Sequence, residues 1–458
     1  MSKSVYFIGI GGIGMSAIAR HYAMQGYMVA GYDRTPSALT RELESEGIAV
    51  SYTDDPATIP SFCSDPKTMV VLTPAIPADN RIWAHFRNMG HQIVKRSQAL
   101  GHLTADKETY CVAGTHGKTT TSTLAAHILR QSTMGCSAFL GGISVNYGTN
   151  YWGTQTSPVV VTEADEFDRS FLQLRPKAAV ITAMDADHLD IYGTHAEVIK
   201  AFLQFAALVR EGGTLIFRRG LPLGREDVAT GVKLLTYAMQ DPDADCHAEN
   251  IRIEGGRYVF SVVTPMGTVA DIRMGLPGRH NVENCVAAVA LSLTAGVSPE
   301  EIRAACASFR GNKRRFEMAL ETDEALVIDD YAHHPQEIRT TLQSVRELYA
   351  GRRVTVAFQP HLYSRTRDLA DDFAQALSMA DRTWLVDIYP AREQPIEGVN
   401  SAMLLGKMKA GVGKLTDKEH LVQSIVSEPT DVVVVMGAGD IDKLVPEIAQ
   451  AVKRAHNL

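Results

Sequence analysis

Short apolar runs rich in β-branched residues alternate along this chain with stretches that have the apolar spacing of helices. The first run covers residues 5–10 and precedes a helical pattern over residues 13–25. Similar runs predict strands at residues 28–31, 69–72, 110–113, 159–162, 178–181, 214–217, 232–237, 326–328, 354–358, 384–386 and 432–435. Further helices are expected at residues 119–130, 281–295 and 299–307. This alternation predicts an α/β fold whose parallel sheets carry helices on both faces.

The pattern changes between residues 248 and 273, where three runs alternate apolar with polar positions. They cover residues 250–254, 258–263 and 268–273 and predict an antiparallel meander. Two charged segments, TADKE near residue 105 and GNKRR near residue 312, separate three βα series. We therefore predict three domains, which cover residues 1–105, 106–311 and 312–458.

Composition and charge narrow the class of protein. The 458 residues are 45% hydrophobic and 21% charged, which excludes a disordered, collagen-like or coiled-coil chain. A net charge of -7 gives no general preference for nucleic acid or an anionic membrane, so neither partner is expected. The six cysteines are scattered without a CxxC pair, which fits a reducing cytoplasm. Glycines interrupt the uncharged N-terminal run, so we expect no signal peptide.

A glycine cluster joins the first predicted strand to the first helix. Gly9, Gly11, Gly12 and Gly14 let backbone N–H groups approach a pyrophosphate at a helix N-terminus. Asp33 ends the second strand, where a ribose-binding acid is found in dinucleotide-binding folds. These residues alone fit NAD and a nucleotide-linked substrate equally well. A tight strand–helix turn without a ligand is the simpler alternative.

A second loop, GTHGKTTT at residues 114–121, also joins a strand to a helix. It departs from the usual P-loop, because Val112 stands where GxxxxGK[ST] has its first glycine. In such a loop backbone amides surround phosphates, the lysine neutralises their charge, and a threonine hydroxyl can hold Mg²⁺. The residues expected to bind ATP are Gly114, Thr115, His116, Gly117, Lys118, Thr119 and Thr120.

Two acidic clusters follow predicted strands. Residues 162–168, TEADEFD, carry four carboxylates that repel one another unless cations compensate them. Glu163, at the strand end, is a natural Mg²⁺ ligand together with Thr119. Residues 185–190, DADHLD, place His188 among three aspartates, a donor set that suits a second divalent cation. The alternatives are a solvated acidic loop and a structural histidine.

Four polar segments of the last part of the chain are further candidates for ligand contacts. Asn281 and Asn284 open a helix, where their amides can contact a purine, although asparagine is also a common helix cap. Arg315 lies in a basic segment that is either a phosphate contact or a solvated linker. The segments DDYAHHP and HLYSRTRD follow strands, at the end where open α/β sheets bind ligands.

Nine segments, in this order, together resemble the Mur ligase family of peptidoglycan synthesis. They are GIGGIGMS, AGTHGKTTT, EADEFDRSF, DADHLDIYG, PGRHNVEN, NKRRFE, DDYAHHP, FQPHLYSRTRD and DIYPAREQPIEGV, and they extend over essentially the whole chain. The last four are similar to the alanine-adding branch of the family. The resemblance implies a Rossmann-like N-terminal domain for a UDP-sugar and a central P-loop-type ATPase domain with a mixed sheet. It also implies a Rossmann-like C-terminal domain for the amino acid.

The resemblance implies a cytoplasmic, ATP- and Mg²⁺-dependent ligase. Its substrates would be UDP-N-acetylmuramate and L-alanine, joined through an acyl phosphate on the lactyl carboxylate, by a monomer or a weak homodimer. A sister ligase that attaches glycine, serine, another amino acid or a recycled murein peptide is the near alternative. An NAD-dependent oxidoreductase is a more distant alternative, because it leaves the GKTTT loop and the DH turn unexplained. A non-enzymatic nucleotide-regulated binding protein is similarly distant.

The same resemblance implies roles for single residues. Contacts to the UDP-sugar are expected from Gly11, Gly12, Gly14, Asp33, Thr73, Ala75 and Asn80. Asn281 and Asn284 would contact adenine, Asp330 the ribose and Arg315 the terminal phosphate. The alanine pocket would be lined by Tyr331, His333 and Arg365. Thr119 with Glu163 would hold one Mg²⁺ and His188 the second. The catalytic residues would be Lys118, Glu163, His188, Arg315 and His333.

Two positions depart from the family pattern. Leu362 replaces a residue that is often basic in this branch. Phe202 falls on or beside the place of a carbamylated lysine in other Mur ligases, and Lys200 is not taken as its substitute. The base that deprotonates the amine stays open between His188, His333 and a carboxylate such as Glu166.

Overall fold

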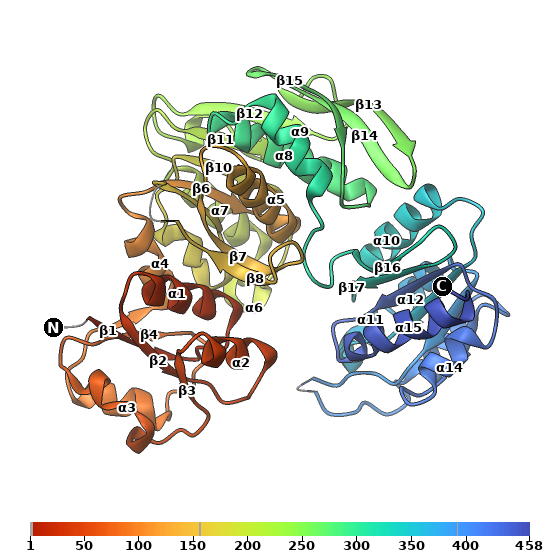
Figure 1. The fold of residues 1–458 in the computed structure, drawn as a ribbon, viewed down its shortest axis with the longest axis horizontal. Helices are drawn as coiled ribbons and strands as arrows, with labels where there is room; N and C mark the ends of the chain where they lie inside the picture. Colours follow the sequence, from red (N-terminus) through yellow and green to blue (C-terminus); the bar gives the residue numbers. More distant parts are fainter. Residues whose placement is uncertain (1–2, 155–156, 392) are drawn as a thin grey trace. The chain divides into compact units, whose positions relative to one another are not determined.

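The computed structural model describes residues 3–154, 157–391 and 393–458. Three sheets run through these ranges, each with its own group of helices (Figure 1). The chain forms two compact units. The first extends to Glu249 and includes Phe260–Ile272 and Glu283–Cys306, and the second comprises Asn250–Val259, Arg273–Val282 and Ala307–Leu458. The α/β class is confirmed.

The N-terminal sheet is parallel throughout, with the strand order β3-β2-β1-β4-β5. Its strands are β1 (Ser4–Ile8), β2 (Met28–Tyr32), β3 (Ala49–Ser51), β4 (Met69–Leu72) and β5 (Ile93–Lys95). Its helices are α1 (Ile13–Met24), α2 (Ala38–Ser45), α3 (Arg81–Asn88) and α4 (Arg96–Thr104). The direction of winding reverses between β1 and β4. Doubly wound sheets bind ligands at such a switch point, beyond the carboxyl ends of the strands.

The central sheet is mixed, with the order β15-β14-β13-β12-β11-β10-β6-β9-β7-β8. Its strands are β6 (Glu108–Ala113), β7 (Ser137–Ser144), β8 (Thr149–Trp152), β9 (Val159–Glu163), β10 (Ala178–Ile181), β11 (Thr214–Arg218), β12 (Lys233–Ala238), β13 (Cys246–Glu254), β14 (Arg257–Thr264) and β15 (Gly267–Arg273). Its helices are α5 (Lys118–Gln131), α6 (Leu189–Tyr192), α7 (His195–Ala206), α8 (Arg279–Thr294) and α9 (Pro299–Ser308). Two-residue connections join β13, β14 and β15, which only antiparallel neighbours permit, in agreement with the predicted meander.

The C-terminal sheet has the order β16-β17-β21-β18-β19-β20, and only β16 is antiparallel to its described neighbour. Its strands are β16 (Glu317–Glu321), β17 (Leu326–Asp330), β18 (Val354–Phe358), β19 (Arg382–Leu385), β20 (Gly413–Leu415) and β21 (Val432–Met436). Its helices are α10 (Pro335–Leu348), α11 (Tyr363–Asp368), α12 (Ala370–Leu377), α13 (Ser401–Lys407), α14 (Leu421–Val426) and α15 (Val445–Ala455). A parallel sheet with helices on both faces has two apolar faces to bury, which explains the continuous run of valines in β21.

One apolar core joins the N-terminal and central sheets within the first unit. Phe7 and Ile18 of the N-terminal part belong to the same buried cluster as Phe139 and Tyr151 of β7 and β8. Arg20 of α1 is also buried and donates to the side-chain oxygen of Asn150 at 2.5 Å. Because side chains of α1 are buried between the N-terminal and central sheets, α1 and the glycine loop before it are fixed against the central sheet.

Among the described residues no helix combines the length and the apolar character that a membrane span requires.

Candidate active site

The GTHGKTTT loop runs from the end of β6 into α5, as the sequence predicted. Gly114 and Gly117 have φ angles of 135° and 79°, which side chains rarely adopt. Thr182, at the end of the neighbouring β10, fixes the loop by donating its hydroxyl to the carbonyl of Ala113 at 3.1 Å and to that of His116. A Cβ on Gly114 would lie 2.0 Å from the Thr182 oxygen, so the loop packs too closely for any side chain there.

Lys118 reaches from the first turn of α5 to a buried carboxylate. Its Nζ donates to Glu166 Oε1 at 2.8 Å and to the carbonyl of Gly114 at 2.6 Å. Glu166 is only 1% exposed, and burial raises its pKa although Lys118 opposes the shift. Its second oxygen, Oε2, is buried without a hydrogen-bond partner among the described residues. The lysine is therefore fixed over the loop by one oxygen of a carboxylate whose other oxygen faces no protein donor.

Strand register explains why segments distant in sequence meet here. Strand β6 lies between β9 and β10, with Val112 opposite Glu163 and Ala113 opposite Ile181. The loops after these three parallel strands therefore leave the sheet at the same edge. Residues 114–117, the acidic segment 164–168 and the DADHLD segment all begin there, which places their polar side chains within reach of one another.

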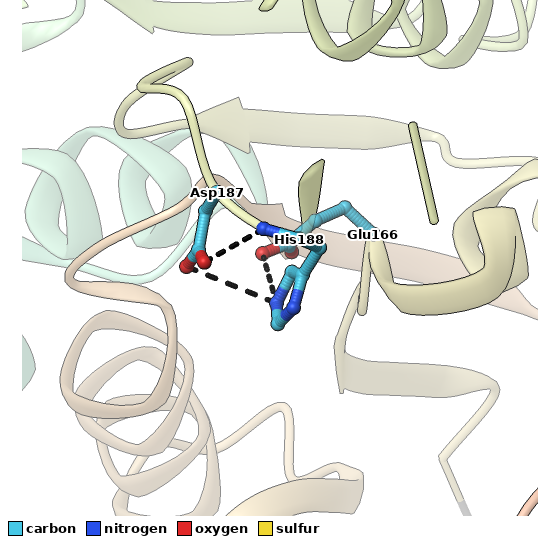
Figure 2. A group of neighbouring side chains, drawn as sticks. All are labelled: Glu166, Asp187 and His188. Atoms are coloured by element: carbon cyan, nitrogen blue, oxygen red, sulfur yellow. Dashed lines mark hydrogen bonds and ion pairs between the residues drawn. The ribbon is translucent and has the colours of Figure 1, made fainter. Parts of the chain in front are cut away.

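Glu166, Asp187 and His188 form a compact cluster at this edge. Figure 2 shows the three side chains converging, and one ligand atom from each lies within 4.8 Å of the others. The His188 Nε2 is 3.8 Å from Glu166 Oε1 and 3.8 Å from Asp187 Oδ2. Two carboxylates and an imidazole can hold a divalent cation. The side chain of Asp190, the third aspartate of the predicted set, lies outside the described residues.

A pocket of about 320 Å³ lies between the N-terminal loops and the central sheet, within the first unit. It contains Glu163, whose carboxylate lies over Gly141, where a Cβ would come within 2.3 Å of both oxygens. The expected UDP-sugar residues that line the pocket are Gly12, Gly14, Thr73 and Ala75. The pocket thus joins the expected UDP-sugar loop to an expected metal ligand.

The three other expected UDP-sugar residues, Gly11, Asp33 and Asn80, form hydrogen bonds within the N-terminal part of the chain. Asp33 accepts a hydrogen bond at 2.8 Å from the backbone N–H of Gly11, which ties the glycine loop to the end of β2. Asn80 is 5% exposed and caps α3 by accepting from the Trp83 N–H at 2.8 Å. Gly11 and Asp33 therefore shape the loop, whereas Asn80 is not among the residues described as lining the pocket.

Arg96, which belongs to none of the sequence motifs, lines the same pocket. Its Nη2 donates to Asp165 Oδ2 at 3.1 Å, and its side chain is 19% exposed. Arg96 opens α4 directly after β5, a strand of three residues that the apolar pattern did not reveal. An arginine at a strand–helix junction was the only sequence signal that pointed to this residue.

The two asparagines expected at adenine fall into different units. Asn284 belongs to the first unit, where its Oδ1 accepts from the Thr121 hydroxyl at 3.3 Å and lies beside Gly117. Asn281 belongs to the second unit, where it lies in the first turn of α8 and its side-chain amide donates to the carbonyl of Pro277 at 2.6 Å. Asn284 is thus part of the P-loop surroundings, and the adenine contacts of both asparagines stay predictions.

Asp330 and Arg315 lie close together in the second unit. The Asp330 carboxylate accepts from the backbone N–H groups of Phe316 at 2.9 Å and Ala332 at 2.8 Å. Burial raises its pKa to about 6, while these hydrogen bonds and the charge of Arg315 oppose the shift. Arg315 itself is exposed, so its guanidinium is accessible to a ligand.

Tyr331, His333 and Arg365 gather beyond β17 and β18 of the same unit. The rings of Tyr331 and His333 are 5.2 Å apart, and the His333 and His361 rings are 6.1 Å apart. Burial lowers the pKa of His333, and the charge of Arg365 acts in the same direction. Arg365 Nη1 is buried and has no hydrogen-bond partner in the part of the chain that the structure describes. A partly buried guanidinium of this kind can bind a carboxylate. The backbone of Leu362, with φ of 70°, leads into α11 and its Arg365.

Comparison with known proteins extends over all three sheets. Family models match residues 4–108 as "Mur ligase family, catalytic domain", 112–292 as "Mur ligase middle domain" and 314–439 as "Mur ligase, glutamate ligase domain". The chain belongs to the Mur ligase family. The resemblance inferred from the nine segments is thereby confirmed.

This Mur ligase is similar to curated relatives over nearly its whole length. It is 49% identical to the UDP-N-acetylmuramate--L-alanine ligase of Phocaeicola vulgatus, with 97% of each chain covered. It is 48% identical to the protein of the same name from Porphyromonas gingivalis strain W83, with 98% of each covered.

Solved structures show the same architecture. The UDP-N-acetylmuramate-alanine ligase from Thermotoga maritima matches with a TM-score of 0.82 and 26% identity over 99% of each chain. A murein peptide ligase from Psychrobacter arcticus matches with a TM-score of 0.66 and 23% identity, over 98% of this Mur ligase and 99% of that chain, and supports the fold alone. The predicted three-domain α/β architecture is confirmed, whereas its boundaries at residues 105 and 312 stay predictions.

Proposed function

We propose that this Mur ligase uses ATP to join L-alanine to the lactyl carboxylate of UDP-N-acetylmuramate through an acyl phosphate, in the cytoplasm. The names of the full-length relatives support the substrates. The structural observation that carries the proposal is the position of Lys118. It lies on a phosphate-type loop at the sheet edge where Glu166 and the pocket residue Glu163 also emerge. A carboxylate substrate in this pocket would lie beside the loop proposed to hold ATP.

The reaction needs two steps, because a carboxylate does not acylate an amine directly. First, an oxygen of the lactyl carboxylate attacks the γ-phosphorus, the bond to the ADP oxygen breaks, and an acyl phosphate forms. Second, the neutral amine of alanine attacks the acyl carbon, the C–N bond forms, and phosphate leaves. Lys118 and Arg315 would stabilise the charge on the transferred phosphoryl group, mainly by electrostatics and positioning.

Mg²⁺ is the cation that the family implies, and the donors of this site fit it. Thr119 and Glu163 would supply oxygen ligands for one ion, and the cluster of Glu166, Asp187 and His188 would hold a second. A bound Mg²⁺ neutralises charge on phosphate oxygens. With Glu166 on such a cation, the ammonium group of Lys118 would be available to the phosphates.

The amine of alanine must lose a proton before or during its attack. The Nδ1–H of His333 donates a hydrogen bond to the Tyr331 carbonyl at 2.9 Å. Burial lowers the pKa of His333, which favours the neutral imidazole that a base requires. Arg365 would bind the alanine carboxylate in the same cluster. His188 and Glu166 remain the alternatives to His333 as the base, but only while they do not coordinate a cation.

Phosphate release from ATP tests the proposal. Wild type is expected to release phosphate only when UDP-N-acetylmuramate and L-alanine are both present, without any absorbance change from added NAD(P)H. A panel with glycine, serine and murein tripeptide in place of alanine separates the sister activities. Equal turnover with murein tripeptide would assign the chain to the recycling branch instead.

Lys118→Ala is the matched variant for the same assay. We expect it to lose at least about 100-fold in turnover, because a preorganised charge at the transferred group typically contributes that much. Its affinity for UDP-N-acetylmuramate should stay near that of wild type, because Lys118 is not among the described lining residues of the pocket. Near-normal turnover in this variant would contradict the role of the GKTTT loop in ATP binding.

A further inference from the structure

The pocket between the N-terminal loops and the central sheet is lined by more acidic than basic side chains. Two carboxylates line it, Glu163 and Asp165. Arg96 is the one lysine, arginine or histidine among the described residues that line it. A sugar nucleotide brings two phosphate charges, and the lactyl group adds a third. The pocket therefore offers a single side-chain cation to a strongly anionic substrate.

Arg96 lies directly against the glycine loop. A Cβ on Gly14 would come within 2.8 Å of Arg96 Nη1 and 3.2 Å of its Cδ. Gly14 belongs to the first turn of α1, whose N-terminal amides already favour an anion. The guanidinium and the helix N-terminus thus present positive potential to the same side of the pocket.

The partner of Arg96 in the structure is replaceable. The Asp165 side chain is 37% exposed, and an ion pair at such a site contributes little to stability, about 0–1 kcal/mol. A guanidinium with five N–H donors can also bind two anions at once. Exchange of one Asp165 oxygen for a phosphate oxygen, or a bridge between the two, therefore costs little.

We propose that Arg96 binds the diphosphate of the sugar nucleotide, beside the amides of the glycine loop. The inference rests on the proposed function, because that function supplies the UDP-sugar. It adds a substrate-binding side chain that the segment GIGGIGMS does not contain. Asp165 lies between Glu163 and Glu166, so Arg96 also connects the sugar-nucleotide pocket to the segment that holds Lys118.

Calorimetric titration of UDP-N-acetylmuramate, without ATP or alanine, tests this role. We expect Arg96→Met to raise the Kd about 10- to 100-fold, the loss typical of a charge-assisted hydrogen bond. The Kd of Arg96→Lys should lie between those of Arg96→Met and wild type, because lysine keeps the charge but lacks the planar guanidinium group. Arg87→Met, which removes an exposed arginine of α3, is the matched control and should bind as wild type does. Thermal melting checks that each variant is folded.

Asp165→Asn separates substrate binding from a purely structural ion pair. If Arg96 serves the substrate, release from Asp165 should leave the affinity unchanged or increase it, and Arg96→Met should still weaken binding in the Asp165→Asn background. Equal weakening by the two single variants, with no further loss in the double variant, would mean that the pair only fixes the loop and would overturn the proposal.

A second ligand identifies the anion that Arg96 meets. UDP-N-acetylglucosamine keeps the diphosphate but lacks the lactyl carboxylate, and its affinity is measured by competition. If Arg96→Met weakens the affinity for both ligands by the same factor, the result supports contact of Arg96 with the diphosphate, which both ligands share. A loss confined to the muramate would assign Arg96 to the carboxylate and overturn the proposal. Wild type that binds no UDP-N-acetylmuramate would instead refute the proposed function, which is a different result from equal binding by wild type and Arg96→Met.

Discussion

Two buried carboxylates of this Mur ligase, Glu166 and Asp329, differ in whether a cation pairs with them. Glu166 has the ammonium of Lys118 at 2.8 Å. Asp329, at 5% exposure, has no described ion pair, and its Oδ1 lacks a hydrogen-bond partner among the described residues. Burial raises the pKa of Asp329 to about 7, Arg314 opposes this shift, and Glu317, Asp442 and Asp330 add to it. Asp329 is therefore a residue whose charge costs stability at neutral pH.

We expect Asp329→Asn to stabilise the second unit at pH 8 but not at pH 4. The carboxyl of the unfolded chain ionises near its ordinary pKa of 3.8, whereas in the folded chain it ionises near 7. The folded state therefore loses stability as the pH rises between these values, and the neutral amide avoids that loss. The gain should be about 1–4 kcal/mol at pH 8, since one pKa unit is about 1.4 kcal/mol.

Thermal or urea unfolding at both pH values measures the effect. Asp106→Asn, at an exposed position, is the control and should change stability little at either pH. Equal destabilisation by Asp329→Asn at pH 4 and pH 8 would show that the carboxylate makes a needed contact and that the predicted linkage is wrong.

At the scale of elements, the loop between β6 and α5 depends on its glycines. A Cβ on Gly114 would lie 2.0 Å from Thr182 Oγ1 and 2.8 Å from the backbone nitrogen of Ala183. Gly114→Ala should therefore displace the loop from the end of β10. We expect a loss of turnover of at least about 100-fold, as for a misplaced catalytic group, and an increased KM for ATP.

Gly212→Ala is the matched control for this prediction. Gly212 also has a positive φ, 74°, but a Cβ there would meet nothing within 4 Å. This variant should lose only about 1–2 kcal/mol of folding stability, because alanine disfavours a positive φ, and it should keep its turnover. Similar activity of the two variants in the phosphate-release assay would contradict the importance of the close approach at Gly114.

The apolar pattern of the sequence predicts the bounds of some strands correctly and misses other strands. The predicted bounds of β4, β10 and β18 agree with the structure, because these strands are central and buried on both faces. The pattern did not reveal β3, β5, β7, β8, β16 or β20. Strands β3, β5 and β20 have only three residues, and β7 contains two glycines, so neither length nor periodicity marks them.

At the scale of the whole molecule, an acidic chain must bind anionic substrates. The net charge is -7, and carboxylates such as Glu163, Glu166 and Asp187 face the site. We expect removal of Mg²⁺ by EDTA to abolish phosphate release, and added Mg²⁺ to restore it, because these carboxylates would otherwise repel the ATP phosphates. Binding of UDP-N-acetylmuramate should persist in EDTA, since Arg96 and the glycine loop would supply its positive potential.

Calorimetry and the phosphate assay, run with and without chelator, check both parts. Full turnover in EDTA would contradict the proposed metal sites. Loss of sugar-nucleotide binding in EDTA would mean that the pocket also depends on the cation.

The sequence by itself determined the α/β class, the order of the three domains and the loops that carry the chemistry. Those features depend on local signals: apolar periodicity, glycine at positive φ, and contiguous motifs such as GTHGKTTT. Tertiary structure alone decided which side chains meet. Strand order placed β9 and β10 beside β6, which joined Lys118 to Glu166 and grouped His188 with Glu166 and Asp187. Packing also brought Arg96 of α4 to Gly14 of α1 and to Asp165 after β9, because contacts between segments distant in sequence leave no local pattern in the chain.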